Sequence, residues 1–98
     1  MRVLKVAVRK EYFLEIQSGK KKEEYREIKE YWIKRLSKKY DEIWITLGYP
    51  QKLEKEKILK FKYNGFEIKT IKHKEFGTSN VIVYAISLKE PIQEETWI

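Results

Sequence analysis

The chain of 98 residues contains no cysteine and a single histidine, His73. Without cysteine there is no disulfide and no thiolate metal site, and one histidine among scattered carboxylates does not give the spacing of a zinc site. We therefore expect no metal and no cofactor. Because no serine or cysteine lies near it, we interpret His73 as a surface histidine rather than a general base. Stability then has to come from the hydrophobic core.

Long apolar runs are also missing. No window approaches the roughly 18 uninterrupted apolar residues of a membrane span, and residues 1–5 lack the apolar core of a signal peptide. We therefore expect a cytoplasmic protein that does not enter a membrane. An apolar content of 42% in 98 residues is enough for one compact domain and too little for two. We predict a single domain over residues 1–98, present as a monomer.

Acidic residues are scarce in the first part of the chain. Residues 1–40 hold 13 Lys or Arg and 6 Glu, whereas residues 41–98 hold 9 Lys and 9 Asp or Glu. The formal charge of +7 therefore belongs to the N-terminal part. Such a distribution is expected of a protein that meets a polyanion with one face. A solvated surface rich in Lys and Glu explains the same composition, and composition alone does not separate the two.

The first forty residues predict two strands and two helices. Alternating apolar residues indicate the first strand, and apolar residues at spacings of three and four indicate the helices, the second of which exposes a basic face. In order, we expect a strand over 3–8, a short helix with Tyr12, Phe13 and Ile16 on one face that ends at Gly19, a loop running into a strand over 20–27, and an amphipathic helix over 28–40.

The rest of the chain reads as strands. We expect strands over 43–47, 58–63, 66–70 and 81–88, turns at 48–50 and 77–80, and an irregular tail beyond Pro91. Asn64-Gly65 is a type I′ hairpin signal, so the strands on either side of it should pair antiparallel. Six short strands, two early helices and no βαβ alternation predict an α+β fold, a partly open barrel or roll.

The most informative stretch is Gly19-Lys20-Lys21-Lys22-Glu23-Glu24-Tyr25-Arg26, which has the pattern G-x-K-x-x-E-x-R. This pattern, placed after a first strand and a short helix, resembles the signature of the ASCH family. The resemblance extends over the whole chain. Within the family, the chain is similar to the small members found in microbial and phage genomes. It implies a PUA-like small β-barrel of about five to six mostly antiparallel strands with two helices near the N-terminus. It also implies binding of RNA or a nucleotide, or chemistry on one.

The chemistry of these residues can be read directly. If the segment is extended, Glu24 and Arg26 lie on one face and can pair, whereas Lys21 has the opposite parity and joins them only if the chain bends after Gly19. The three would then offer a cation for phosphate, a carboxylate for amine or hydroxyl protons, and a planar guanidinium. Alternatively the segment is a solvated charged turn, where an exposed pair contributes only ~0–1 kcal/mol.

Aromatic residues near this motif are candidates for stacking on a base. Tyr25 lies within it and Trp32 follows it, although aromatics at helical spacing also fit a core. Tyr49, in the turn 48–50, is harder to explain by packing. The predicted ligand-binding residues are Gly19, Lys21, Glu24, Tyr25, Arg26, Trp32 and Tyr49.

Two classes of function follow. The first is a module that binds single-stranded RNA or a nucleotide. The second is an enzyme, because the resemblance includes branches that hydrolyse the acetyl amide of 4-acetylcytidine or cleave RNA; Lys21 and Glu24 would then be catalytic. The amidohydrolase branch carries threonine where Glu24 stands and has a longer insertion that supplies a further acid. A third reading is a protein-binding domain that uses the basic face of the helix over 28–40.

Overall fold

A computed structural model describes all residues except 52, 74–76, 78 and 93–98. Its described part is an α+β fold with two α-helices and six strands, which confirms the predicted class. The elements are β1 (Val3–Val8), α1 (Lys10–Gln17), β2 (Glu23–Glu27), α2 (Glu30–Leu36), β3 (Glu42–Leu47), a 3₁₀ turn (Lys55–Lys57), β4 (Ile58–Lys62), β5 (Phe66–Ile71) and β6 (Val81–Ser87).

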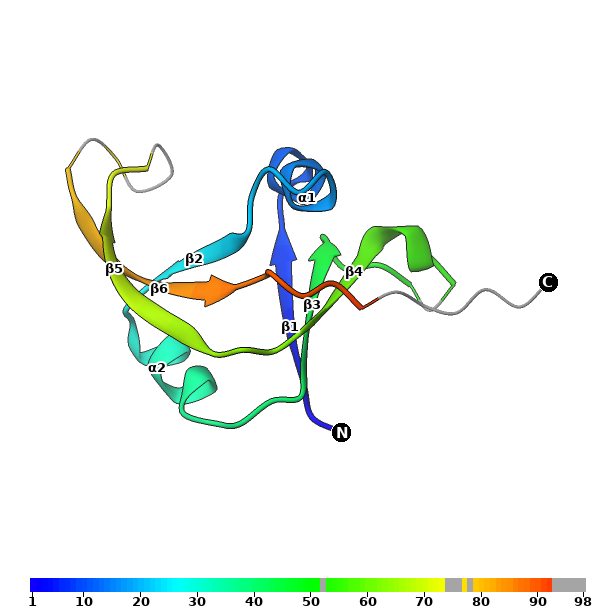
Figure 1. Cartoon of the computed structure of the whole chain (residues 1–98), viewed down its shortest axis with the longest axis horizontal. Helices are drawn as coiled ribbons and strands as arrows, with labels where there is room; N and C mark the ends of the chain where they lie inside the picture. Colours follow the sequence, from blue (N-terminus) through cyan, green and yellow to red (C-terminus); the bar gives the residue numbers. More distant parts are fainter. Residues whose placement is uncertain (52, 74–76, 78, 93–98) are drawn as a thin grey trace.

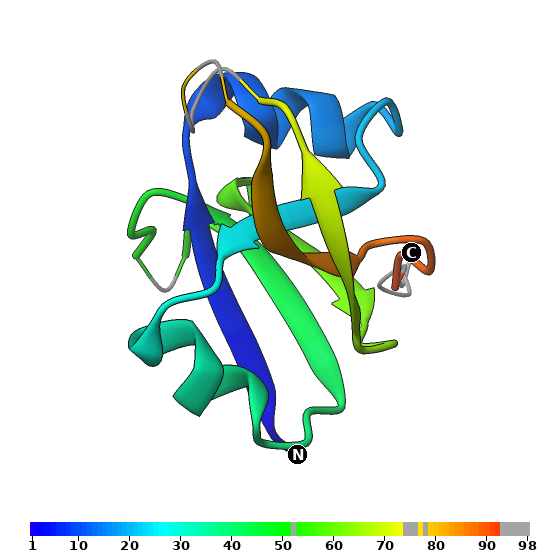
Figure 2. The same cartoon turned by 90° about the vertical axis from the view of Figure 1, so that its left-hand side faces the viewer.

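The described strands form two three-stranded sheets, neither of which closes into a barrel. The first has the order β1-β3-β4, with β1 parallel to β3 and β4 antiparallel to it; the second has the order β2-β6-β5 and is fully antiparallel. Helix α1 lies at one end of the two sheets and α2 at the other (Figure 1). Turned by 90°, β2, β6 and β5 lie in front of β1 and β3 (Figure 2).

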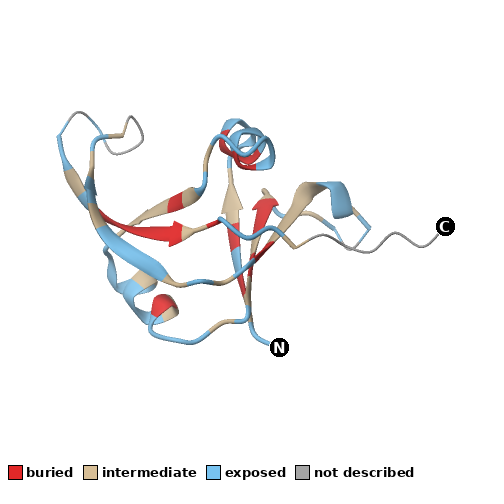
Figure 3. Cartoon of the chain, viewed as in Figure 1, coloured by how far each residue is buried: buried red, intermediate tan, exposed pale blue. Residues whose placement is uncertain are grey.

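The core lies between the two sheets. Because side chains alternate along a strand, β1 and β3 each turn one face toward β6. Leu4, Ile43 and Ile45 from the first sheet and Ile86 from the second have no exposed surface. Figure 3 shows this buried band on β1, β3 and β6, closed by the inner face of α1. Phe13 and Ile16 supply that face, as their helical spacing predicts.

One seam between the sheets is joined by backbone hydrogen bonds. After β6 the chain runs along β4, where Lys62 N donates to the carbonyl of Glu90 at 2.9 Å and Ile92 N donates to that of Lys60 at 2.9 Å. On the way, Leu88 N donates to the carbonyl of Lys22, just before β2. This segment satisfies backbone groups on the otherwise open edge of β4.

The predicted hairpin at Asn64-Gly65 is wrong. β4 pairs with β3 and β5 pairs with β6, so the two residues carry the chain from one sheet to the other. A type I′ turn needs positive φ at both central residues, but here only Gly65 has it, at 79°. The Asn64 amide instead donates to the Glu90 carboxylate at 3.0 Å, and the Gly65 carbonyl accepts from Ser87 N. These longer-range contacts override the local turn signal.

Helix α2 is shorter than the predicted 28–40. It ends at Leu36, with Ser37 as its C-cap, although apolar spacing continues to Tyr40. The Tyr40 hydroxyl donates to the Arg35 carbonyl at 2.6 Å, so this residue folds back onto the helix end instead of extending it. Neither helix in the described part is long and apolar enough to cross a bilayer. The predicted tail, from residue 93 onward, and residue 78 of the predicted turn lie outside the described residues.

The packing of β6 gives a first prediction. Replacing Ile86, which is 0% exposed, by Ala leaves a cavity between the sheets and should lower the free energy of unfolding by about 2–5 kcal/mol. Ile82 on the same strand is 55% exposed, so Ile82→Ala should change the free energy of unfolding by at most about 0.5 kcal/mol. Denaturant unfolding of both variants tests this; equal losses would contradict the placement of the core.

Candidate functional site

The inward face of β2 carries Glu24 and Arg26. In the register of the second sheet Glu24 lies beside Ile86 and Arg26 beside Tyr84, both core residues of β6. Since residues two apart share a face, the predicted extended conformation places both charged side chains toward the first sheet. Arg26 reaches it: Nη2 donates to the carbonyl of Ala7 on β1 at 3.0 Å.

Lys21 reaches the same place because the chain bends after α1. Gly19 has φ of 83°, a conformation that costs glycine little, and its N–H donates to the Ile16 carbonyl at the end of the helix. Lys21 N then donates to the Glu15 carbonyl, which holds the turn. As a result Lys21 Nζ lies 3.4 Å from Glu24 Oε1. The bend on which the sequence prediction depended is present.

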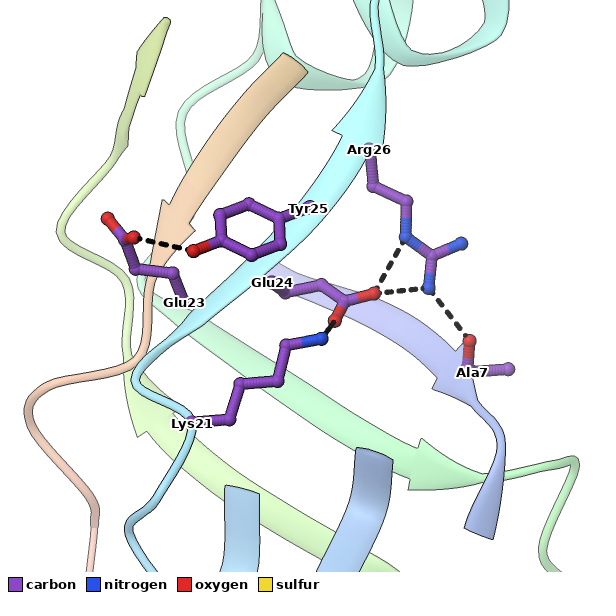
Figure 4. A network of polar contacts seen from close by, with 6 residues as sticks. All are labelled: Ala7, Lys21, Glu23, Glu24, Tyr25 and Arg26. Atoms are coloured by element: carbon purple, nitrogen blue, oxygen red, sulfur yellow. Dashed lines mark hydrogen bonds and ion pairs between the residues drawn. The ribbon is translucent and has the colours of Figure 1, made fainter. Parts of the chain in front are cut away.

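Glu24 is the centre of the site. It is only 4% exposed, and its two carboxylate oxygens are divided between two cations. Oε2 accepts from Arg26 Nε at 2.9 Å and lies 2.6 Å from Nη2, while Oε1 faces Lys21. Figure 4 shows the two side chains converging on the carboxylate. The alternative of a solvated turn is wrong for Glu24, since a buried carboxylate needs such partners.

A pocket of about 390 Å³ opens beside this trio. Its walls include Tyr12 and Tyr25, whose ring centroids lie 4.4 and 5.4 Å from Lys21 Nζ. Trp32 forms another wall, with its ring centroid 5.0 Å from Arg26 Cζ and 4.9 Å from Arg35 Cζ. The pocket therefore combines aromatic rings with cations whose positions are fixed by Glu24. This size falls in the range of small-molecule sites, roughly 300–1,000 Å³.

The outward face of β2 carries a second polar group. The Tyr25 hydroxyl donates to Glu23 Oε1 at 3.2 Å, and Lys69 Nζ from β5 donates to Oε2 of the same carboxylate at 2.7 Å. Burial first, and the negative charge of Glu23 second, raise the pKa of the Tyr25 phenol above its ordinary value. The hydrogen bond to Glu23 raises the pKa of Lys69. The hydrogen bond to Glu23 thus holds Tyr25 in position at the wall of the pocket.

The structure brings together five of the seven predicted binding residues. Lys21, Glu24, Tyr25, Arg26 and Trp32 line the pocket. Gly19 does not line it and serves the turn instead; a Cβ there would meet no atom within 4 Å, so its φ is what favours glycine. Tyr49 is 95% exposed in the turn after β3 and lies outside the pocket lining.

Sequence reasoning missed several residues of the pocket. Tyr12 was assigned to the core, and it is buried, but its ring also faces Lys21. His73 was interpreted as a surface residue; it is partly buried, with its ring 5.6 Å from Tyr12 and 6.2 Å from Tyr25. Arg9 and Lys29 add two further cations. These residues come from separate segments, and no local pattern marks them as neighbours.

No group of three or more His, Cys, Asp or Glu that could hold a metal ion occurs among the residues placed by the structure. Every buried side-chain nitrogen or oxygen in that part of the chain has a hydrogen-bond partner. Comparison of the chain with protein-family models, with curated proteins and with solved structures finds no match.

The buried carboxylate gives a second prediction. Glu24→Ala leaves Lys21 and Arg26 facing each other without a counter-ion, so we expect a loss of about 1–3 kcal/mol in the free energy of unfolding, less than for a fully buried pair because both cations are partly exposed. The control is Glu30→Ala, which removes an exposed partner of Lys34 and should cost at most about 1 kcal/mol. Denaturant unfolding that gives the two variants the same stability would refute the role of Glu24.

The outward pair gives a third prediction. Glu23→Gln removes the negative charge beside Tyr25 and should lower the phenol pKa, while the part of the rise due to burial remains. Glu67→Gln is the matched control, because Glu67 also contacts Lys69, at 3.8 Å, but is not a cause of the Tyr25 shift. NMR titration of labelled tyrosine, with Tyr25→Phe for assignment, measures both; an equal fall in the two variants would contradict the assignment.

Proposed function

We propose that the pocket beside Glu24 binds one nucleotide unit of single-stranded RNA. The observation that carries the proposal is the buried Glu24 carboxylate, which holds Lys21 and Arg26 at the edge of an aromatic-walled pocket. Single-stranded RNA is recognised by aromatic stacking of its bases together with cationic contacts to its backbone. Both kinds of group converge here within one pocket of about 390 Å³.

Each wall has a role in this proposal. The partly exposed rings of Tyr25 and Trp32 offer flat surfaces for a base, each worth ~1–3 kcal/mol when a base stacks on it, whereas Tyr12 is buried and its ring faces Lys21. Arg26 commits Nε and Nη2 to Glu24 and Ala7, whereas its Nη1 donates to no described residue and remains available to a ligand oxygen. Arg9 and Lys29 extend the positive charge along the rim, where a phosphate would lie.

The same arrangement supports the proposal that the chain is a PUA-like domain of the ASCH type. The residues of the G-x-K-x-x-E-x-R pattern that carry charge are the ones that meet in the pocket, and the glycine supplies the turn that this requires. Two sheets with six strands in their described part and two helices are compatible with this family.

Binding without catalysis accounts for the contacts better than hydrolysis does. Both oxygens of Glu24 face cations, so the carboxylate serves to anchor Lys21 and Arg26 rather than to take a proton from a substrate. A general base has to come within hydrogen-bond reach of the proton that it removes. Glu24 would have to release Arg26 or Lys21 before it could do so.

The test is fluorescence anisotropy of a short labelled single-stranded RNA at several salt concentrations. We expect Lys21→Ala to weaken binding by about ten-fold or more, since it removes the cation that faces two aromatic walls. Arg26→Lys keeps the charge but loses the planar fork, so it should also weaken binding.

The control is the double variant Lys34→Ala and Lys38→Ala on and just after α2, which removes more charge from exposed residues that do not line the pocket. It should at most flatten the plot of the logarithm of the binding constant against the logarithm of salt concentration. The slope of this plot should change by ~0.7 for each phosphate that the protein no longer neutralises. Thermal unfolding of each variant shows that it is folded at the binding temperature. An equal effect of pocket and helix variants, or no binding by the wild type, would overturn the proposal.

A further inference from the structure

Three hollows of the described surface adjoin one another. The pocket beside Glu24 shares Tyr12, Lys21, Tyr25 and His73 with a shallow hollow of about 410 Å³. That hollow shares Lys21, Lys22 and Lys89 with a third of about 610 Å³, which lies between the end of α1, β4 and the segment after β6. Each hollow shares lining residues with the next, and Lys21 lines all three, so we call the three adjacent hollows the track.

The track concentrates positive charge. Among the residues that the structure describes, ten Lys or Arg and four Glu line the three hollows. Within the described lining, the third hollow has five lysines and no acidic residue. Lys55, Lys60, Lys69 and Lys89 come from the part of the chain that has no net charge by sequence. Folding therefore assembles a basic surface that the division of charge along the chain does not reveal.

The third hollow also has an aromatic wall. Trp44 lies in the middle strand of the first sheet, where its neighbours across the strands are Lys5 and Lys60. Its indole Nε1 donates to Glu42 at 2.7 Å, which fixes the ring, and Lys60 Nζ lies 4.3 Å from the ring centroid. Lys5 Nζ also lies 5.6 Å from this centroid, so a base that stacks on the ring takes the place of a lysine head in a surrounding that is already positively charged.

We propose that this track is the path of a single strand of RNA, which continues from the nucleotide pocket past Lys21 and Lys22 to a second base-stacking site on Trp44. The inference rests on the proposed function, because the pocket supplies the first nucleotide. The adjacency of the three hollows gives the route, and the excess of lysines gives the charge complementary to phosphates. Apolar lining such as Ile58 and Leu59, which are partly exposed, suits the base rather than the backbone.

Affinity as a function of RNA length tests the proposal. Nucleoside monophosphates and labelled oligonucleotides of three, six and nine nucleotides are titrated against wild type, Trp44→Leu and the double variant Lys55→Ala with Lys89→Ala. For the wild type we expect affinity and salt dependence to rise with length. Trp44→Leu should weaken binding of the longest strand about ten-fold and leave the mononucleotide unchanged. The lysine variant should flatten the salt slope by ~0.7 for each phosphate that these lysines neutralise in the wild type.

The matched control is again Lys34→Ala with Lys38→Ala, which removes the same charge from the region of α2 and should change the slope less. If the mononucleotide binds but affinity does not rise with length, the pocket stands and the track is refuted. If the track variants weaken binding of the longest RNA no more than the helix variant does, net charge alone explains the effect, and the track is again refuted. If no RNA of any length binds, both proposals fail.

Discussion

A carboxylate buried between two sheets is the constraint on which the site depends. Removing a carboxylate from water costs several kcal/mol unless cations and hydrogen bonds replace the water. Glu24 points inward because it shares a face of β2 with Arg26 and lies beside Ile86. Its position thus requires that Arg26 fold onto it and that the chain after α1 bend to deliver Lys21. The end of α1, β2 and the Ala7 carbonyl of β1 are all joined through this one group.

The same constraint suits the pocket to the anionic, planar ligand that we propose. Two cations that lie close together repel each other in the absence of a counter-ion, and Glu24 offsets this repulsion before any ligand arrives. The geometry of Arg26 is fixed further by the Trp32 ring, which also contacts Arg35, and Arg35 in turn donates to the Lys5 carbonyl at 2.8 Å. A ligand therefore meets cations already in position and loses little binding free energy in ordering them.

Local patterns in the sequence predict the elements well and their pairing less well. Alternation and helical spacing place both helices and five of the six described strands, while β2 is expected only from its position between two helical patterns; parity along β2 then predicts the pairing of Glu24 with Arg26. The predicted hairpin at Asn64-Gly65 is wrong because a two-residue turn signal contains no information about distant strands. In the structure β4 pairs with β3, and β5 pairs with β6. His73 likewise carries no local mark, since its neighbours Tyr12 and Tyr25 lie more than forty residues earlier in the chain.

The two cations of the site are not equivalent. Arg26 makes two close contacts with one oxygen of Glu24, at 2.6 and 2.9 Å, and a third contact with Ala7. Lys21 makes a single contact at 3.4 Å and lies against two aromatic rings. If a phosphate drew Lys21 away, Glu24 would keep its shorter pair with Arg26, so the buried charge would stay compensated. In the proposed function Arg26 therefore meets a ligand from a fixed position through Nη1, whereas Lys21 is the cation that turns toward it.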